Sequence, residues 1–517
     1  MERRDFILKM SALAGAAAIP AAPYALAGGR LTPEALGTSG KNASTKVKVV
    51  FFYHLADVQD RPDWPNVGYD FRPDMISMVR RLNEGVSDVE FIPAKANGDA
   101  SIKDLLKADA KEGIAGYVAV QTNCWNQGIE PLTASGKPVL YTSLPYSGDG
   151  GWLVYNNRLY PKPNYASIAS FDFGAVVRVA AAFSMIKKGG VKAFKKEADR
   201  LIDEIIPKEN KFAAREGKIP CLTPEEVLAK CKGLKMLSVS DSKNVDGAKQ
   251  LKDDFGIETI FVSYDEINAA TAAADVGKAA VVAAKWKDRA VAIYDVSDEE
   301  IEGSARVYVG MKDLLEKYGA SAITVNCLGA CYGGHIPNYP CLGFMELQNE
   351  GLMGVCENDY GGTLSMIIAN TLTKGQRIGY MSDPVLDYST RSIIYAHCVC
   401  TTKFWGPDGP DSRFEILTHS EDRKGASVRT IAPVGYPETS FIFLPNLKKL
   451  IIHTGIIAGN SKDDRACRTK IISEVTGDYS KMSIGWDNWH HVTVFADIKD
   501  EVIALASKLG YAIVQQS

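Results

Sequence analysis

The sequence predicts an α/β protein: two N-terminal domains on open parallel sheets of the Rossmann or flavodoxin type, then a C-terminal α+β domain with a β-rich part. The 517 residues exceed what one core can organise, and 46% of them are hydrophobic, which is enough for several cores. Short apolar runs alternate with helical periodicity over the first 320 residues, and short β-rich segments follow. We expect an export signal over 1–30 and domains over 45–165, 166–320 and 321–517.

The N-terminal segment resembles a twin-arginine export signal. Arg3 and Arg4 precede a mildly apolar Ala/Gly-rich stretch, and Ala25-Leu26-Ala27 offers an A-x-A cleavage site. We therefore expect a protein that is periplasmic or otherwise exported. Beyond this segment no uninterrupted apolar run reaches about 18 residues, so no membrane span is expected in the mature chain.

The next two regions each alternate strand and helix, which is typical of parallel α/β sheets. In the first region we expect strands at 47–53, 89–92, 116–121 and 137–142 and helices at 73–83 and 102–108. A Gly/Pro/Asn-rich stretch over 145–163 marks the boundary. In the second we expect strands at 235–239, 258–262 and 290–293 and helices at 245–254 and 298–318. Neither region carries a Gly-rich phosphate-binding motif at a strand-to-helix turn, which disfavours nucleotide binding.

In the last third of the chain the regular alternation of strand and helix gives way to short segments rich in β-forming residues. We expect a strand at 322–326, helices at 343–350 and 363–372, and later β-rich segments at 427–431, 439–444 and 449–454. These short segments predict the β-containing part of the C-terminal domain.

Charge and cysteine content narrow the classes of partner. A formal net charge of −3 lacks the basic footprint of a nucleic-acid-binding protein, so a small, weakly charged ligand is expected. Ten cysteines are too few for a disulfide-built scaffold of this length. Cys327, Cys331 and Cys341 lack the C-x2-C spacing of zinc sites, so we expect a buried or disulfide-paired set.

Acids and histidines that follow apolar runs are the candidates for chemistry. Glu357 and Asp383 are each expected where a strand ends, on neighbouring strands, so that their carboxylates converge. His397 and the adjacent pair His490 and His491 also lie among apolar residues. Two carboxylates with imidazole suit Mn²⁺ or a similar divalent cation and leave positions for substrate oxygens.

Two segments resemble the C-terminal half of the L-fucose and L-arabinose isomerase superfamily. They are CENDYGGTLSMIIANTLTKG at 356–375, with Asp383 downstream, and WHHVTVFADIKDEVIALASKLGYAIV at 489–514. The resemblance implies Mn²⁺ bound by Glu357, Asp383 and one late histidine, His490 or His491, and by His397 as in the arabinose branch. Neighbours in a strand face opposite sides, and counting back from Phe495 favours His490.

The resemblance also implies a reaction, an aldose–ketose isomerisation through an enediol with a carbohydrate substrate. Glu357 and Asp383 would be the catalytic pair, one removing and the other returning the proton. His335, Trp125 and Asp359 are further candidates for substrate contact, and Asp359 and Glu346 have the alternative of supporting the site. Fold analogy indicates a homo-oligomer. Two other functions stay open: an exported carbohydrate-binding protein without turnover, and a metal-assisted sugar hydrolase.

Overall fold

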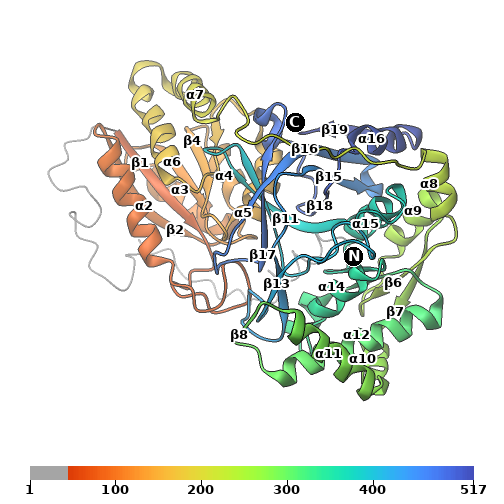
Figure 1. Cartoon of the computed structure of the whole chain (residues 1–517). Helices are drawn as coiled ribbons and strands as arrows, with labels where there is room; N and C mark the ends of the chain where they lie inside the picture. The colour runs from red at the N-terminus through yellow and green to blue at the C-terminus, as the bar shows by residue number, and fades with distance from the viewer. Residues whose placement is uncertain (1–44) are drawn as a thin grey trace.

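A computed structural model describes residues 45–517 (Figure 1). The expected export signal over 1–30 lies outside the described residues. The structure is a mixed α/β fold with two parallel sheets and a β-rich C-terminal part, which confirms the predicted fold class. Figure 1 shows the first sheet and its helices at the left, the second sheet at the lower right and the β-rich part at the centre and upper right.

The first sheet is parallel throughout and has five strands in the order β2-β1-β3-β4-β5. Its strands are β1 (Thr45–Phe52), β2 (Val89–Ala96), β3 (Ile114–Gln121), β4 (Val139–Ser143) and β5 (Tyr165–Ser167). The central strands are buried almost throughout, because helices cover both faces of a parallel sheet. Its helices are α2 (Arg72–Gly85), α3 (Gly98–Asp109), α4 (Ile129–Ala134), α5 (Asp149–Leu159), α6 (Phe173–Ala180), η1 (Ala181–Met185) and α7 (Ile186–Ile205).

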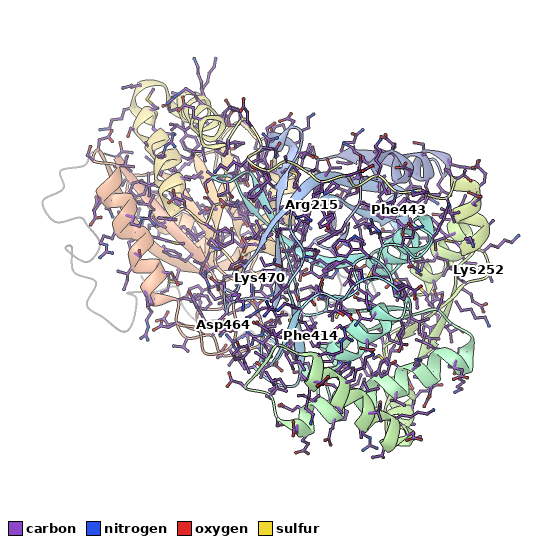
Figure 2. The ribbon with its side chains drawn as sticks, viewed as in Figure 1. Arg215, Lys252, Phe414, Phe443, Asp464 and Lys470 are labelled. Carbon is purple, nitrogen blue, oxygen red and sulfur yellow. The ribbon has the colours of Figure 1, made fainter. Side chains whose placement is uncertain are left out.

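A long connection leaves α7 and crosses the β-rich part to reach the second sheet, as Figure 1 shows at the top of the view. The backbone N–H of Arg215, labelled in Figure 2, donates to the carbonyl of Gly435 at 2.8 Å. Further along, Leu222 donates to the carbonyl of Leu372 at 2.9 Å. These contacts hold the crossing segment against the last third of the chain.

The second sheet is also parallel, in the order β10-β9-β6-β7. Its strands are β6 (Lys235–Val239), β7 (Glu258–Val262), β9 (Ala322–Val325) and β10 (Met353–Val355). Its helices are α8 (Pro224–Cys231), α9 (Val245–Phe255), α10 (Tyr264–Ala273), α11 (Val276–Arg289), α12 (Asp298–Tyr318), α13 (Cys327–Tyr332), α14 (Cys341–Asn349) and α15 (Tyr360–Leu372). The sheet extends past the boundary expected at residue 320, and the domain limits themselves stay predictions.

One expected strand belongs to a different sheet. The run at 290–293 was expected in the second parallel sheet, but β8 (Ala292–Tyr294) pairs with β13 (Phe414–Leu417), which in turn pairs with β14 (Ser427–Thr430). Local pattern predicts a strand but does not identify its partner.

The β-rich part is a closed antiparallel barrel. The seven-stranded sheet has the order β15-β18-β11-β12-β17-β16-β19, and β15 also pairs with β16, so every strand except β19 lies in a closed ring. These strands are β11 (Tyr380–Asp387), β12 (Ser392–His397), β15 (Pro437–Leu444), β16 (Lys449–Asn460), β17 (Thr469–Val475), β18 (His491–Val494) and β19 (Ala512–Gln515). The short helices η2 (Pro445–Leu447), η3 (Tyr479–Ser483) and α16 (Lys499–Lys508) complete this part.

Two helices bring the three parts together. Helix α5 of the first part packs on β11, and α15 lies between the second sheet and the barrel, in contact with β10, β15 and β18. The carboxyl end of β10 therefore lies beside barrel strands. Within residues 45–517, none of the helices is both long and apolar enough to cross a bilayer.

Candidate metal centre

Four of the predicted side chains meet at the junction between the second sheet and the barrel. Glu357, Asp383, His397 and His490 each present a ligand atom, and these atoms all lie within 4.8 Å of one another. Glu357 follows β10, Asp383 lies on β11, His397 ends β12 and His490 directly precedes β18. The group therefore assembles residues that are more than 130 positions apart in the chain.

Glu357 is held in an unusual backbone conformation. Its φ is 64° and that of Asn358 is 52°, so two successive non-glycine residues are left-handed between β10 and α15. The turn is fixed by the Asn358 N–H, which donates to the carbonyl of Val325 at 3.0 Å, and by the Ser238 hydroxyl, which donates to Asn358 Oδ1 at 2.8 Å. Such strain persists where surrounding contacts over-determine it, often at functional sites.

Asp383 lies at a different position in the fold from the one that the sequence predicts. Glu357 does follow a strand of the parallel sheet, but Asp383 lies in the middle of an antiparallel barrel strand, opposite Ala396 of β12. The two acids are thus not at the ends of neighbouring strands of one sheet. They converge because α15 packs the second sheet against the barrel.

The two adjacent late histidines point to opposite sides, as strand geometry requires. His490 Nε2 lies 3.1 Å from Asp383 Oδ1 and 3.5 Å from Glu357 Oε2. His491 packs its ring 4.6 Å from Trp486 and 5.4 Å from His453, and it is not in the four-residue group. Burial lowers the pKa of His491 well below its ordinary value. The structure therefore brings His490, and not His491, to the acids.

Asp359 orients His490. Its Oδ2 lies 2.7 Å from His490 Nδ1, while its Oδ1 accepts the Gly361 N–H at 3.0 Å and caps α15. A proton held on Nδ1 by a carboxylate leaves the Nε2 lone pair directed at the acids, which is the usual arrangement around a metal-bound histidine. Asp359 thus contacts a candidate ligand.

His397 differs from His490 in the hydrogen-bond partner of its Nδ1 atom. The Val399 N–H donates to His397 Nδ1 at 3.3 Å, which places the proton of the neutral ring on Nε2, 3.6 Å from Glu357 Oε1. Burial lowers the pKa of His397, but the hydrogen bond with Glu357 and the charge of Asp383 outweigh it, and the net shift is upward. The two acids therefore make His397 easier to protonate than an ordinary histidine.

The donor set fits a divalent cation. Two carboxylates and the Nε2 lone pair of His490 match the preferences of Mn²⁺ and similar ions, and His397 Nε2 would become a fourth ligand on losing its proton. Asp383 Oδ1 is buried and makes no hydrogen bond to another described residue. A buried polar atom without such a bond is costly unless another partner satisfies it, and a cation in the middle of the group would do so for Asp383.

The three remaining predicted residues, Trp125, His335 and Glu346, lie in three different places outside the four-residue group. Trp125 is half-buried and packs edge to face on Trp489, with ring centroids 5.4 Å apart. It therefore contacts the residue that directly precedes His490. His335 is exposed and stacks on Tyr264 with ring centroids 5.2 Å apart. Glu346 is buried against Lys285 and Trp286 on another helix. The structure brings neither His335 nor Glu346 into the four-residue group.

A cavity adjoins the group and contains residues that the sequence analysis missed. It is lined by Cys327, Leu328, Cys331, Tyr339, Cys341, Cys356, Glu357, His397, Cys398, His419, Glu421 and Cys467. Burial raises the pKa of Glu421 to about 8, and its Oε2 accepts the Tyr332 hydroxyl at 2.7 Å. The run His419-Ser420-Glu421-Asp422 was the available signal, a polar cluster between two β segments. None of the residues that line this cavity is a lysine or arginine.

All ten cysteines lie in the described part of the chain, and all are free thiols. The expectation of a buried set is confirmed for Cys327 and Cys341, while Cys331 is half-buried. The alternative, disulfide pairing, is not seen in this structure. The three thiols do share one cavity, together with Cys356, Cys398 and Cys467.

The fold and the site define a class: an α/β protein with a four-residue group that could hold a metal ion, in which Glu357 is half-buried and the other three residues are buried. No protein-family model matches the chain. The chain is similar to a sulfoquinovose isomerase from Clostridium sp. (strain MSTE9), with 25% identity over 221 residues, which cover 40% of this chain and 46% of that protein. The match thus spans less than half the length of this relative.

Solved structures give only distant likenesses. A sugar ABC transporter from Yersinia enterocolitica subsp. enterocolitica 8081 shows 11% identity and a TM-score of 0.16, over 56% of this chain and 67% of that chain. A periplasmic ribose ABC transporter from Conexibacter woesei DSM 14684 shows 14% identity and a TM-score of 0.16, over 55% and 74%.

Proposed function

We propose that this protein is a metal-dependent aldose–ketose isomerase that acts on a sugar through an enediol. The observation that carries the proposal is the convergence of Glu357, Asp383, His397 and His490 within 4.8 Å. The similarity to a sulfoquinovose isomerase supports the reaction class. We propose Mn²⁺ as the cation, since carboxylate and imidazole ligands suit it.

In this proposal the two carboxylates move the proton. One of Glu357 and Asp383 removes a proton from a carbon next to the carbonyl, and the other returns it to the neighbouring carbon. His490 is held in one tautomer by Asp359, and His397 offers an N–H from Nε2 to an oxygen of the substrate. The cation, when bound, would supply Lewis-acid stabilisation of the negative charge that develops on the substrate oxygens.

The cavity favours a substrate without an anionic group at this position. Glu357 and Glu421 line it and none of its lining residues is a lysine or arginine, so a sulfonate placed there would meet two carboxyl groups and no ammonium or guanidinium group. We therefore propose a neutral aldose or ketose in place of the sulfonated sugar named for the relative. In this proposal the protein shares the type of reaction with the relative but acts on a different sugar.

The test is a panel of neutral pentoses and hexoses, one neutral oligosaccharide and one sulfonated hexose, incubated with the Mn²⁺-loaded protein in D₂O and followed by NMR. We expect an isomer of one neutral sugar, with deuterium incorporated at the carbon next to the carbonyl, and loss of turnover in Glu357→Gln. Glu346→Gln, which alters a buried acid outside the centre, is the matched control. Sugar binding without turnover would support a binding protein, and cleavage of an oligosaccharide into smaller fragments would support a hydrolase.

A further inference from the structure

Six of the ten cysteines line the cavity beside Glu357 and His397. They come from five separate places: α13 contributes Cys327 and Cys331, α14 begins with Cys341, and the others follow β10, follow β12 and precede β17. None of them is used in the proposed isomerisation. A concentration of free thiols against one cavity therefore needs an explanation of its own.

The thiols make two side-chain contacts. Cys327 lies beside Cys356, and Cys398 lies beside Cys467, close enough that each thiol shifts the pKa of its neighbour. The Ser420 hydroxyl lies 3.3 Å from Cys398 Sγ and donates to Cys467 Sγ at 3.9 Å. Both contacts join residues far apart in the chain but adjacent in space, so two thiol pairs, Cys327/Cys356 and Cys398/Cys467, are preformed.

These pairs do not make a second metal site. In the part of the chain that the structure describes, the group able to hold an ion is the carboxylate–histidine group, and no set of three thiols gathers as closely. A structural zinc site requires about four donors in tetrahedral array. Thiols that lie next to each other in pairs are instead arranged as disulfide formation requires.

Each pair is linked through the backbone to the metal centre. Cys356 directly precedes Glu357, and Cys398 directly follows His397. The other members, Cys327 and Cys467, lie on separate segments. A covalent bond within either pair would therefore tie a segment that carries a candidate ligand to a different part of the fold.

We propose that the pairs Cys327/Cys356 and Cys398/Cys467 are an oxidative modification site, at which a small two-electron oxidant forms two disulfides and thereby weakens cation binding at the adjacent centre. With hydrogen peroxide, one sulfur attacks a peroxide oxygen and becomes a sulfenic acid as water leaves. The second thiol then displaces a second water as the S–S bond forms. Each pair loses two protons and two electrons, and one peroxide is reduced to two waters.

The expected effect on the centre follows from its geometry. Metal ligands must be placed within about 0.2 Å of their preferred distances, and a new bond beside Glu357 and His397 restricts the backbone that positions them. The cation-binding half of this proposal rests on the proposed function. The cross-linking half depends only on the thiol contacts, so the two can fail separately.

The first experiment maps the disulfides. The reduced, metal-free full-length chain is titrated with hydrogen peroxide, remaining thiols are alkylated under denaturing conditions, and peptides are identified by mass spectrometry. We expect cross-linked peptides for both pairs before any other cysteine is oxidised, and their loss on treatment with dithiothreitol. Cys327→Ser and Cys467→Ser should each remove one cross-link, and Cys231→Ser, a buried thiol on α8 outside the cavity, should leave both. If either serine variant fails to fold, the alanine variant takes its place.

The second experiment measures Mn²⁺ affinity by calorimetry before and after oxidation. We expect affinity to fall about tenfold, the size of typical losses around a disturbed ligand shell, and to recover on reduction. The double variant Cys327→Ser/Cys467→Ser should lose this sensitivity. Other pairings, sulfinic acids without cross-links, or Zn²⁺ held by the reduced thiols would overturn the modification site. Cross-links that leave Mn²⁺ affinity unchanged, or reduced protein that binds no Mn²⁺, would overturn the coupling.

Discussion

At the scale of single residues, the candidate centre is organised by what holds each imidazole. His490 Nδ1 contacts the Asp359 carboxylate, whereas His397 Nδ1 accepts a backbone N–H. The two Nε2 atoms that face Glu357 therefore differ in whether they carry a proton. One offers a lone pair and the other offers a proton. Although both Nε2 atoms lie about 3.5 Å from Glu357, the two histidines thus have different roles.

Asp359→Asn should weaken Mn²⁺ binding by tenfold or more, because the amide removes the charge that fixes the His490 tautomer. Thermal stability should change little, since asparagine also caps helices well. Calorimetric titration and a thermal melt separate the two effects. Asp172→Asn, which alters the carboxylate that caps α6, is the control and should leave Mn²⁺ binding unaltered. Equal affinities in Asp359→Asn and the parent protein would contradict this role.

Cation affinity should rise with pH. Burial opposes protonation of His397, yet Glu357 and Asp383 raise its pKa above the ordinary 6.5. An imidazolium in the group repels a cation, so Mn²⁺ binding should strengthen as pH increases from 6.5 through the raised pKa and then level off. Calorimetry across this range in buffers of different ionisation heat would detect the released proton. His397→Gln should flatten the profile, and a parent profile that is already flat would refute the assignment.

At the scale of elements, the barrel encloses a buried polar chain that crosses four strands. Glu438 of β15 accepts hydrogen bonds from the Tyr395 hydroxyl of β12 at 2.8 Å and the Ser473 hydroxyl of β17 at 2.9 Å. His453 of β16 lies 2.7 Å from the same tyrosine oxygen. Burial raises the pKa of Glu438 to about 8 and lowers that of His453 to about 4. Both groups are therefore uncharged at neutral pH, as an enclosed barrel interior requires.

Glu438→Gln should remove a pH-dependent loss of stability. The folded pKa of Glu438, about 8, lies above its ordinary 4.5, so its contribution is fully present below 4.5 and is lost as pH rises through 8. The slope is at most about 1.4 kcal/mol per pH unit. The Tm of the variant minus that of the parent should therefore increase between pH 4.5 and 8. A constant difference across that range would show that the carboxyl titrates normally.

At the scale of the whole molecule, the centre joins two parts of the fold. Glu357 comes from the second sheet, whereas Asp383, His397 and His490 come from the barrel, and α15 packs between them. A cation bound here would connect these parts, and its binding free energy would add to the stability of the folded chain.

Saturating Mn²⁺ should stabilise the protein, by about 2.7 kcal/mol at a free concentration one hundred times the Kd. Differential scanning calorimetry with and without the ion would measure this as a rise in Tm, reversed by a chelator. Glu357→Gln should lose the rise, and Glu346→Gln, a buried acid away from the centre, should keep it. A Tm that does not respond to Mn²⁺ in the parent protein would argue against the centre.

Local pattern in the sequence determined the elements. The helix expected over 298–318 is α12 (Asp298–Tyr318), because Ser297 and Glu300 form a capping box and Gly319 ends the helix in the left-handed conformation. Glu357 was placed after a strand for a similar reason, since an apolar run ends just before it. Periodicity and end signals are short-range properties, so they can be read from neighbouring residues.

Only the tertiary structure decided which elements meet. It placed β8 beside β13, put Asp383 in the middle of a barrel strand, turned His490 toward the acids and His491 away, and brought Cys398 to Cys467. Each of these depends on packing between segments far apart in the chain. Such contacts arise from the shape and burial of complete elements, which the periodicity of any one segment does not record.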